Sequence, residues 1–222
     1  MLSVYQDGIS YAKLSFRIGI DFDNTVVCYD KLFVRTAKAE GLIPHDFRGG
    51  KAGVRELIRR LDGGEDKWQR LQGKVYGGQM ESAPFFDGVE RFLVRCRQRS
   101  DTSVFIVSHK TEFGHFDASG INLREVARAW MAKHAFFDKG GLNLASDAIY
   151  FEATREDKVE RITRLDCTHF IDDLEEVLGH PRFPAGVKRI LFLNGRPEKP
   201  AVSYKVCADW QEIEEAVFEN AG

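Results

Sequence analysis

The sequence predicts an α/β fold, a Rossmann-like parallel sheet with helices on both faces, and three observations support it. Short apolar runs rich in β-branched and aromatic residues recur along the 222-residue chain. Between them, apolar residues recur at spacings of three, four and seven, which is typical of helices with one buried face. The runs and the helical stretches alternate, and this alternation is typical of parallel strands joined by helices.

Five runs are predicted to be strands because they are short and apolar at successive positions, as strands covered on both faces are. They span residues 16–20, 104–107, 148–151, 168–171 and 190–193. Apolar spacing predicts helices over 89–96, 123–131 and 210–217, with others that begin near Lys158 and around Leu174.

One segment interrupts the alternation with three helical patterns and no convincing strand. The patterns lie within 32–39, 54–61 and 68–75, and pairs of glycines separate them. We therefore predict a small helical domain inserted at 28–83 into a core formed by 1–27 and 84–222. Pro84 and the Asp87-Gly88 pair mark the expected return of the chain to the core.

The composition is that of a globular protein, with 43% apolar and 30% charged residues. A net charge of -2 argues against nucleic acid or an anionic membrane as a partner. No apolar run approaches the roughly 20 residues that cross a bilayer, and the N-terminal residues lack the apolar core of a secretory signal. Four scattered cysteines fit free thiols, so we expect a cytoplasmic protein.

Polar residues follow the first predicted strand as Asp21-Phe22-Asp23-Asn24-Thr25. In an open parallel sheet, ligands bind beyond the carboxyl ends of the strands. Residues two apart on a strand point the same way, so Asp21 and Asp23 can address one ligand. Taken alone, an Asp-x-Asp pair is more typical of a solvated or helix-capping loop.

Other polar residues occupy matching places further along the chain. Ser108 ends the second predicted strand, Lys158 follows the third, and Asp172-Asp173 end the fourth. Each has an ordinary alternative, because Ser108 can simply end a strand and Lys158 can lie on a solvated helix face. Asp173 can cap the following helix while Asp172 binds a metal.

The order Asp-x-Asp-x-Thr, Ser, Lys, Asp-Asp resembles the four motifs of the haloacid dehalogenase superfamily of phosphohydrolases and phosphotransferases. The motifs appear here as Asp21-Phe22-Asp23-Asn24-Thr25, Ser108, Lys158 and Asp172-Asp173. The insert at 28–83 lies where that superfamily places a helical cap. The stretch from Pro84 to Val89 looks like its usual return to the core, so the resemblance spans nearly the whole chain.

The resemblance implies a chemical role for each motif. Asp21 would attack phosphorus and form an acyl phosphate, and Asp23 would act as general acid and base. Ser108 would hydrogen-bond a phosphoryl oxygen, and Lys158 would neutralise the developing negative charge. Thr25 would support the loop and touch the phosphate.

The resemblance also implies Mg²⁺, bound by the side chains of Asp21 and Asp172 and by the backbone carbonyl of Asp23. Asp173 would bind through water or anchor the site. Crowded carboxylates repel by about 4 kcal/mol per close pair at an effective dielectric near 20, and a cation relieves this. Oxygen ligands beside a phosphate favour Mg²⁺.

The sequence gives a weaker signal for the residues that determine which substrate binds. His109 and Lys110 follow Ser108 and are expected to bind substrate, although many relatives carry Asn where His109 stands. A basic cluster on the second helical pattern is either a solvated face or an aid in holding an anionic substrate. It consists of Arg55, Arg59 and Arg60.

The expected function is hydrolysis of a small phosphorylated metabolite, a sugar phosphate or a nucleotide, through an aspartyl-phosphate. A phosphomutase and a catalytically silent binding module are the alternatives on the same fold. Asp23 distinguishes the chain from dehalogenases, which need no acid for a departing halide. Near-neutral charge disfavours a metal-dependent nuclease.

Overall fold

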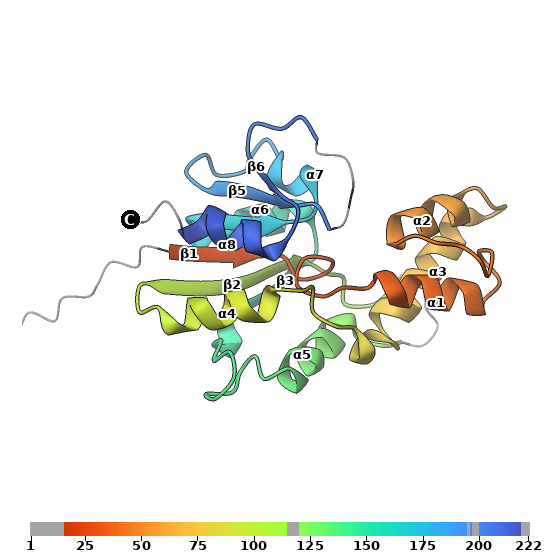
Figure 1. Cartoon of the computed structure of the whole chain (residues 1–222), viewed down its shortest axis with the longest axis horizontal. Helices are drawn as coiled ribbons and strands as arrows, with labels where there is room; N and C mark the ends of the chain where they lie inside the picture. The colour runs from red at the N-terminus through yellow and green to blue at the C-terminus, as the bar shows by residue number, and fades with distance from the viewer. Residues whose placement is uncertain (1–15, 115–119, 195, 197–199, 219–222) are drawn as a thin grey trace, which may run out of the picture.

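Six parallel strands form one sheet in the order β3-β2-β1-β4-β5-β6 in the computed structural model, which describes residues 16–114, 120–194, 196 and 200–218 (Figure 1). Their bounds are β1 Phe16–Ile20, β2 Thr102–His109, β3 Ile149–Glu152, β4 His169–Asp172, β5 Lys188–Phe192 and β6 Lys205–Cys207. The predicted α/β class is confirmed.

Helices cover both faces of this sheet. On one face lie α4 (Val89–Gln98), α5 (Leu123–Lys133) and α8 (Trp210–Phe218), and on the other α6 (Arg155–Arg164) and α7 (Glu175–Leu178). Neighbouring strand residues such as Ile106 and Val107 belong to the separate apolar clusters of the two faces. Burial on both faces explains the continuous apolar runs in the strands.

The predicted elements differ from the observed ones at their ends. Strand β2 continues beyond the prediction to include Ser108 and His109. Helix α6 begins at Arg155, three residues before Lys158, because the Thr154 hydroxyl caps it by accepting the Asp157 N–H at 3.0 Å. Strand β6 was not predicted, since three residues at the sheet edge show no periodicity.

Three helices, α1 (Asp30–Ala39), α2 (Lys51–Arg59) and α3 (Gly64–Tyr76), pack on one another and lie to one side of the sheet (Figure 1). We call them the helical segment. Its centre includes Phe33 and Trp68, whose rings stack with centroids 5.1 Å apart. Two short 3₁₀ turns, Met80–Ser82 and Ser146–Ala148, complete the described elements.

The chain leaves and re-enters the sheet region along two adjacent segments. Residue Cys28 donates its N–H to the carbonyl of Pro84 at 2.9 Å, and Phe86 donates to the carbonyl of Val26 at 3.0 Å. The two segments that flank the helical segment in the sequence therefore lie side by side. Gly88 has φ +88°, a left-handed conformation that favours glycine.

The strand order places the carboxyl ends of β1 and β4 side by side. From β1 the chain continues to β2 on one side, and from β4 it continues to β5 on the other, so the strand order reverses between β1 and β4. Such switch points are where open α/β sheets bind ligands. In Figure 1, the carboxyl end of β1 faces the helical segment. No helix among the described residues is long and apolar enough to span a membrane.

Candidate active site

A buried lysine lies between two buried carboxylates at the carboxyl ends of β1 and β4. The Lys158 Nζ is 2.6 Å from Asp21 Oδ1 and 2.7 Å from Asp172 Oδ2. The side chain of Lys158 is only 1% exposed, and that of Asp172 is fully buried. The structure therefore brings together three residues from distant parts of the sequence, with Asp21 and Lys158 separated by 137 positions.

The environment of Lys158 keeps it charged. Burial alone would lower its pKa, but Asp172 and Asp21 outweigh burial and hold the pKa above its ordinary value. Lys158 lies on the buried stripe of α6 with Val159 and Ile162. The alternative in which Lys158 belongs to a solvated helix face is therefore wrong.

The loop after β1 orients Asp21 from a second side. The Thr25 hydroxyl is fully buried and donates to Asp21 Oδ2 at 3.3 Å, while Lys158 holds Oδ1. Asn24 has φ +64°, which asparagine tolerates better than most residues, and its N–H donates to the carbonyl of Val27. This tight turn brings Thr25 back over Asp21.

Asp23 is held by two donors from different parts of the chain. The Tyr29 hydroxyl donates to Asp23 Oδ1 at 2.7 Å, and Lys110 Nζ lies 2.7 Å from Oδ2. Tyr29 and Lys110 are both buried. Lys110, expected to bind substrate, thus forms an ion pair with Asp23.

Three carboxylates form a cluster with the chemistry of a metal site. Asp21, Asp172 and Asp173 each offer an oxygen, and these atoms lie within 4.8 Å of one another. Burial raises the pKa of Asp172 and Asp173, and the neighbouring carboxylates raise it further, while the Lys158 cation opposes part of the shift. Such an oxygen-only donor set fits Mg²⁺, which would relieve this repulsion.

Asp172, and not Asp173, makes the turn that leads into α7. Its Oδ1 accepts the N–H of Leu174 at 2.9 Å. Helix α7 begins at Glu175 and has no side-chain hydrogen bond at its cap. The prediction that Asp173 caps this helix is wrong, because no side chain caps α7 and the N–H of Leu174 donates to Asp172.

Ser108 carries a buried hydroxyl with an unused hydrogen-bonding capacity. Its Oγ has no hydrogen-bond partner in the described part of the chain, and Ser108 lines the same cavity as Asp21. A buried hydroxyl without a partner is costly, so a ligand oxygen here would be stabilised. The exposed His109 has its Nε2 2.9 Å from the carbonyl oxygen of Ala153, and partial burial of the ring lowers its pKa.

One cavity of about 930 Å³ extends to the helical segment, and its lining includes Asp21, Asp23, Ser108, Lys158 and Asp173. Lys51, Arg55 and Tyr76 line it from α2 and α3. Sequence reasoning missed Lys51, Tyr76 and Tyr29, because lysines and tyrosines on amphipathic helices are ordinarily partly solvated. In the sequence, these residues are marked only by their closeness to the first motif, for Tyr29, and to paired glycines, for Lys51 and Tyr76.

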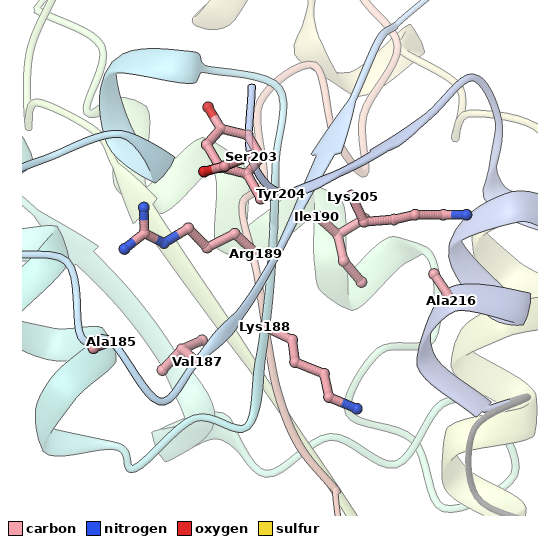
Figure 2. Close-up of a pocket in the computed structure, with 9 residues that line it drawn as sticks. All are labelled: Ala185, Val187, Lys188, Arg189, Ile190, Ser203, Tyr204, Lys205 and Ala216. Carbon is pink, nitrogen blue, oxygen red and sulfur yellow. The ribbon is translucent and has the colours of Figure 1, made fainter. Parts of the chain in front are cut away.

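A second cavity of about 500 Å³ lies at the amino ends of β5 and β6, and none of the predicted motif residues lines it (Figure 2). Its basic side chains, Lys188, Arg189 and Lys205, point in different directions and do not converge on one position. Of these two cavities, only the larger one is lined by the predicted motif residues.

Solved structures show which known fold this is. A haloacid dehalogenase hydrolase of Entamoeba histolytica aligns with TM-score 0.58 and 12% identity, covering 91% of this chain and 97% of its own. A haloacid dehalogenase-like family hydrolase of Streptococcus pneumoniae aligns with TM-score 0.53 and 15% identity, covering 89% and 96%. A haloacid dehalogenase-type protein of Bacillus subtilis, bound to magnesium, aligns with TM-score 0.50 and 13% identity, covering 93% and 100%.

No family model and no curated protein matches the sequence. The chain has the fold of haloacid dehalogenase-like hydrolases, over nearly the whole length of both partners in each alignment.

Proposed function

We propose that this chain is a phosphatase of the haloacid dehalogenase superfamily that hydrolyses a small phosphorylated metabolite. The observation that carries the proposal is the arrangement around Asp21. Its carboxylate is held by Thr25 and Lys158, and it lines one cavity with the unpartnered hydroxyl of Ser108.

In the first step, an Asp21 oxygen attacks phosphorus, and the bond to the leaving alcohol breaks. The Asp21 carboxylate becomes an acyl phosphate, which splits one difficult displacement into two. Ser108 donates a hydrogen bond to a phosphoryl oxygen, and Lys158 balances the negative charge that builds up. Both groups are fixed before substrate arrives, because they are buried.

Asp23 handles the proton in both steps. It gives a proton to the leaving oxygen. In the second step it removes a proton from a water whose oxygen bonds to phosphorus, and the bond between phosphorus and the Asp21 oxygen breaks. Tyr29 and Lys110 fix the position of its carboxylate through one hydrogen bond to each oxygen. With the phosphate released, Asp21 and Asp23 return to their starting states.

Asp21, Asp172 and Asp173 would hold a divalent cation, for which Mg²⁺ fits the oxygen donor set. When bound, this cation supplies positive charge to the phosphoryl oxygens and relieves the repulsion among the carboxylates. The magnesium-bound protein of the same fold supports this choice.

The helical segment would serve as the cap of the active site. Residues of α2 and α3 line the cavity opposite Asp21, so a bound substrate would be enclosed from that side. Enclosure that excludes bulk water favours small substrates such as sugar phosphates or nucleotides over phosphoproteins.

The test is phosphate release from a panel of phosphometabolites, with Mg²⁺ and with EDTA. We expect Mg²⁺-dependent turnover that Asp21→Asn reduces on the order of 10³-fold or more. Circular dichroism of Asp21→Asn should remain that of the wild type, because asparagine is nearly isosteric. If the wild type releases no phosphate from any ester, or Asp21→Asn keeps full activity, the proposal is wrong.

A further inference from the structure

Two cations of helix α2, Lys51 and Arg55, line the cavity without a carboxylate partner. They are four residues apart, so they lie one turn apart on the same helix face. In the described part of the chain, no carboxylate oxygen forms an ion pair within 4.0 Å with the side-chain nitrogens of either residue, and Asp23 and Asp173 act on Lys51 only from a greater distance. The proposed chemistry at Asp21 uses neither of them.

Lys51 is placed by aromatic residues of the helical segment. Its Nζ donates to the Tyr76 hydroxyl at 2.6 Å and lies 5.3 Å and 5.4 Å from the ring centroids of Phe33 and Tyr76. Its backbone N–H donates to Asp30 Oδ1 at 3.0 Å. The ammonium is therefore held toward the cavity with hydrogen-bonding capacity left over.

Each of the other lysine and arginine side chains that line the cavity has a carboxylate partner. In the cavity, Lys110 pairs with Asp23, Lys158 with Asp21 and Asp172, and Arg196 with Glu175. Further along α2 and just past its end, Arg59 pairs with Glu65 and Arg60 with Glu56. Arg55 has no hydrogen bond or ion pair with any described residue, and it is the member of the basic cluster that lines the cavity.

We propose that the leaving alcohol of the substrate carries a second anionic group, a carboxylate or a phosphate, which Lys51 and Arg55 bind. This proposal rests on the proposed function, because it places the reacting phosphate at Asp21 and Ser108. An ammonium and a guanidinium on adjacent turns can together donate several hydrogen bonds to one anion. The substrate class is thus the phosphorylated hydroxy acids and bisphosphates, and not neutral sugar monophosphates.

The test compares matched ligands by calorimetric binding and by turnover. The acidic ligands are 3-phosphoglycerate and glycerol 1,3-bisphosphate, and the neutral analogue is glycerol 3-phosphate. Binding is measured with the Asp21→Asn protein and Mg²⁺, so that it does not depend on turnover. We expect one acidic ligand to bind about 10- to 100-fold more tightly than the analogue, since charged hydrogen bonds contribute this much. Tighter binding of 3-phosphoglycerate would identify the second anionic group as a carboxylate, and tighter binding of glycerol 1,3-bisphosphate would identify it as a phosphate.

The variants decide whether Lys51 and Arg55 cause the preference. Lys51→Met and Arg55→Gln, each added to Asp21→Asn, should bring the binding ratio close to one. Arg60→Gln is the control, because Arg60 pairs with Glu56 and does not line the cavity, and it should keep the full preference. Arg55→Gln also guards against misfolding of Lys51→Met, because Arg55 is exposed and makes no contact that the fold needs.

The outcomes separate the two proposals. Equal binding of acidic and neutral esters, or a preference that survives in both variants, overturns the second-anion proposal. Turnover of neutral and acidic esters at similar kcat/KM also overturns the second-anion proposal, but it supports the proposed phosphatase activity. Binding preference without any phosphate release from the wild type supports the anion subsite and overturns the phosphatase.

Discussion

Replacing Lys158 with methionine should leave two buried carboxylates without the cation they share. Lys158 Nζ lies 2.6 Å from Asp21 Oδ1 and 2.7 Å from Asp172 Oδ2, and all three side chains are at most 7% exposed. At an effective dielectric of 20, each of these pairs is worth about 6 kcal/mol before desolvation is counted. Burying the three charges offsets much of this, and removing one partner of a buried pair costs about 3–5 kcal/mol.

The assay is thermal unfolding of the metal-free protein near neutral pH. A loss of that size corresponds to a Tm lower by about 6–20 °C for a chain of this length. The destabilisation should shrink at acidic pH, because burial raises the pKa of Asp172 and its protonation removes one of the unpaired charges. Mg²⁺ should restore part of the stability by replacing the lost positive charge.

Lys133→Met is the matched control for this experiment. Lys133 forms an exposed ion pair with Glu81 at 3.0 Å, with side chains 54% and 81% exposed. Exposed pairs of this kind contribute at most about 1 kcal/mol. If Lys158→Met melts within a degree or two of Lys133→Met, the reasoning about the buried cation is refuted.

Two further predictions concern the remaining aspartates. Asp23→Asn should slow hydrolysis of alkyl phosphates by about 10²- to 10⁴-fold and of p-nitrophenyl phosphate much less, since only poor leaving groups need the proton; equal losses on both substrates would exclude the acid role. Burial raises the pKa of Asp172 to about 6 and that of Asp173 to about 8, so the folded metal-free protein keeps protons that the unfolded chain has lost. The stability of the folded protein should therefore fall as the pH rises from about 4 to about 8. Unfolding temperatures from about pH 5 to pH 8 test this, and a rise in place of a fall would contradict the assignment.

The sequence alone predicts five of the six strands of the sheet, because buried strands have a strong compositional signal. The polar residues Asp21, Ser108 and Asp172 follow or end such strands, so their convergence comes from topology alone. Lys158 required the superfamily resemblance, since its charged neighbours favour a solvated helix. Only the structure reveals that an apolar stripe buries it.

The parts that sequence reasoning missed depend on contacts between distant residues. Nothing local indicates that Lys110 pairs with Asp23, or that Lys51 meets Tyr76, because each pair joins separate elements. The edge strand β6 is three residues long and begins with a lysine, so it shows neither alternation nor an apolar run. The orientation of Asp173 depends on which aspartate accepts the Leu174 N–H, and the Asp-Asp pair does not specify this.

The paired connections between the sheet and the helical segment have a consequence for how the chain is assembled. Cys28 and Pro84 are hydrogen-bonded neighbours, and Val27 bridges Phe85 in antiparallel fashion. More than fifty residues therefore depart and return through points a few ångströms apart, so joining those points with a tight turn would leave the path of the remaining chain almost unchanged. Because the entropy of closing a loop grows only slowly with its length, this position can accommodate inserts of very different size at little cost to the stability of the sheet.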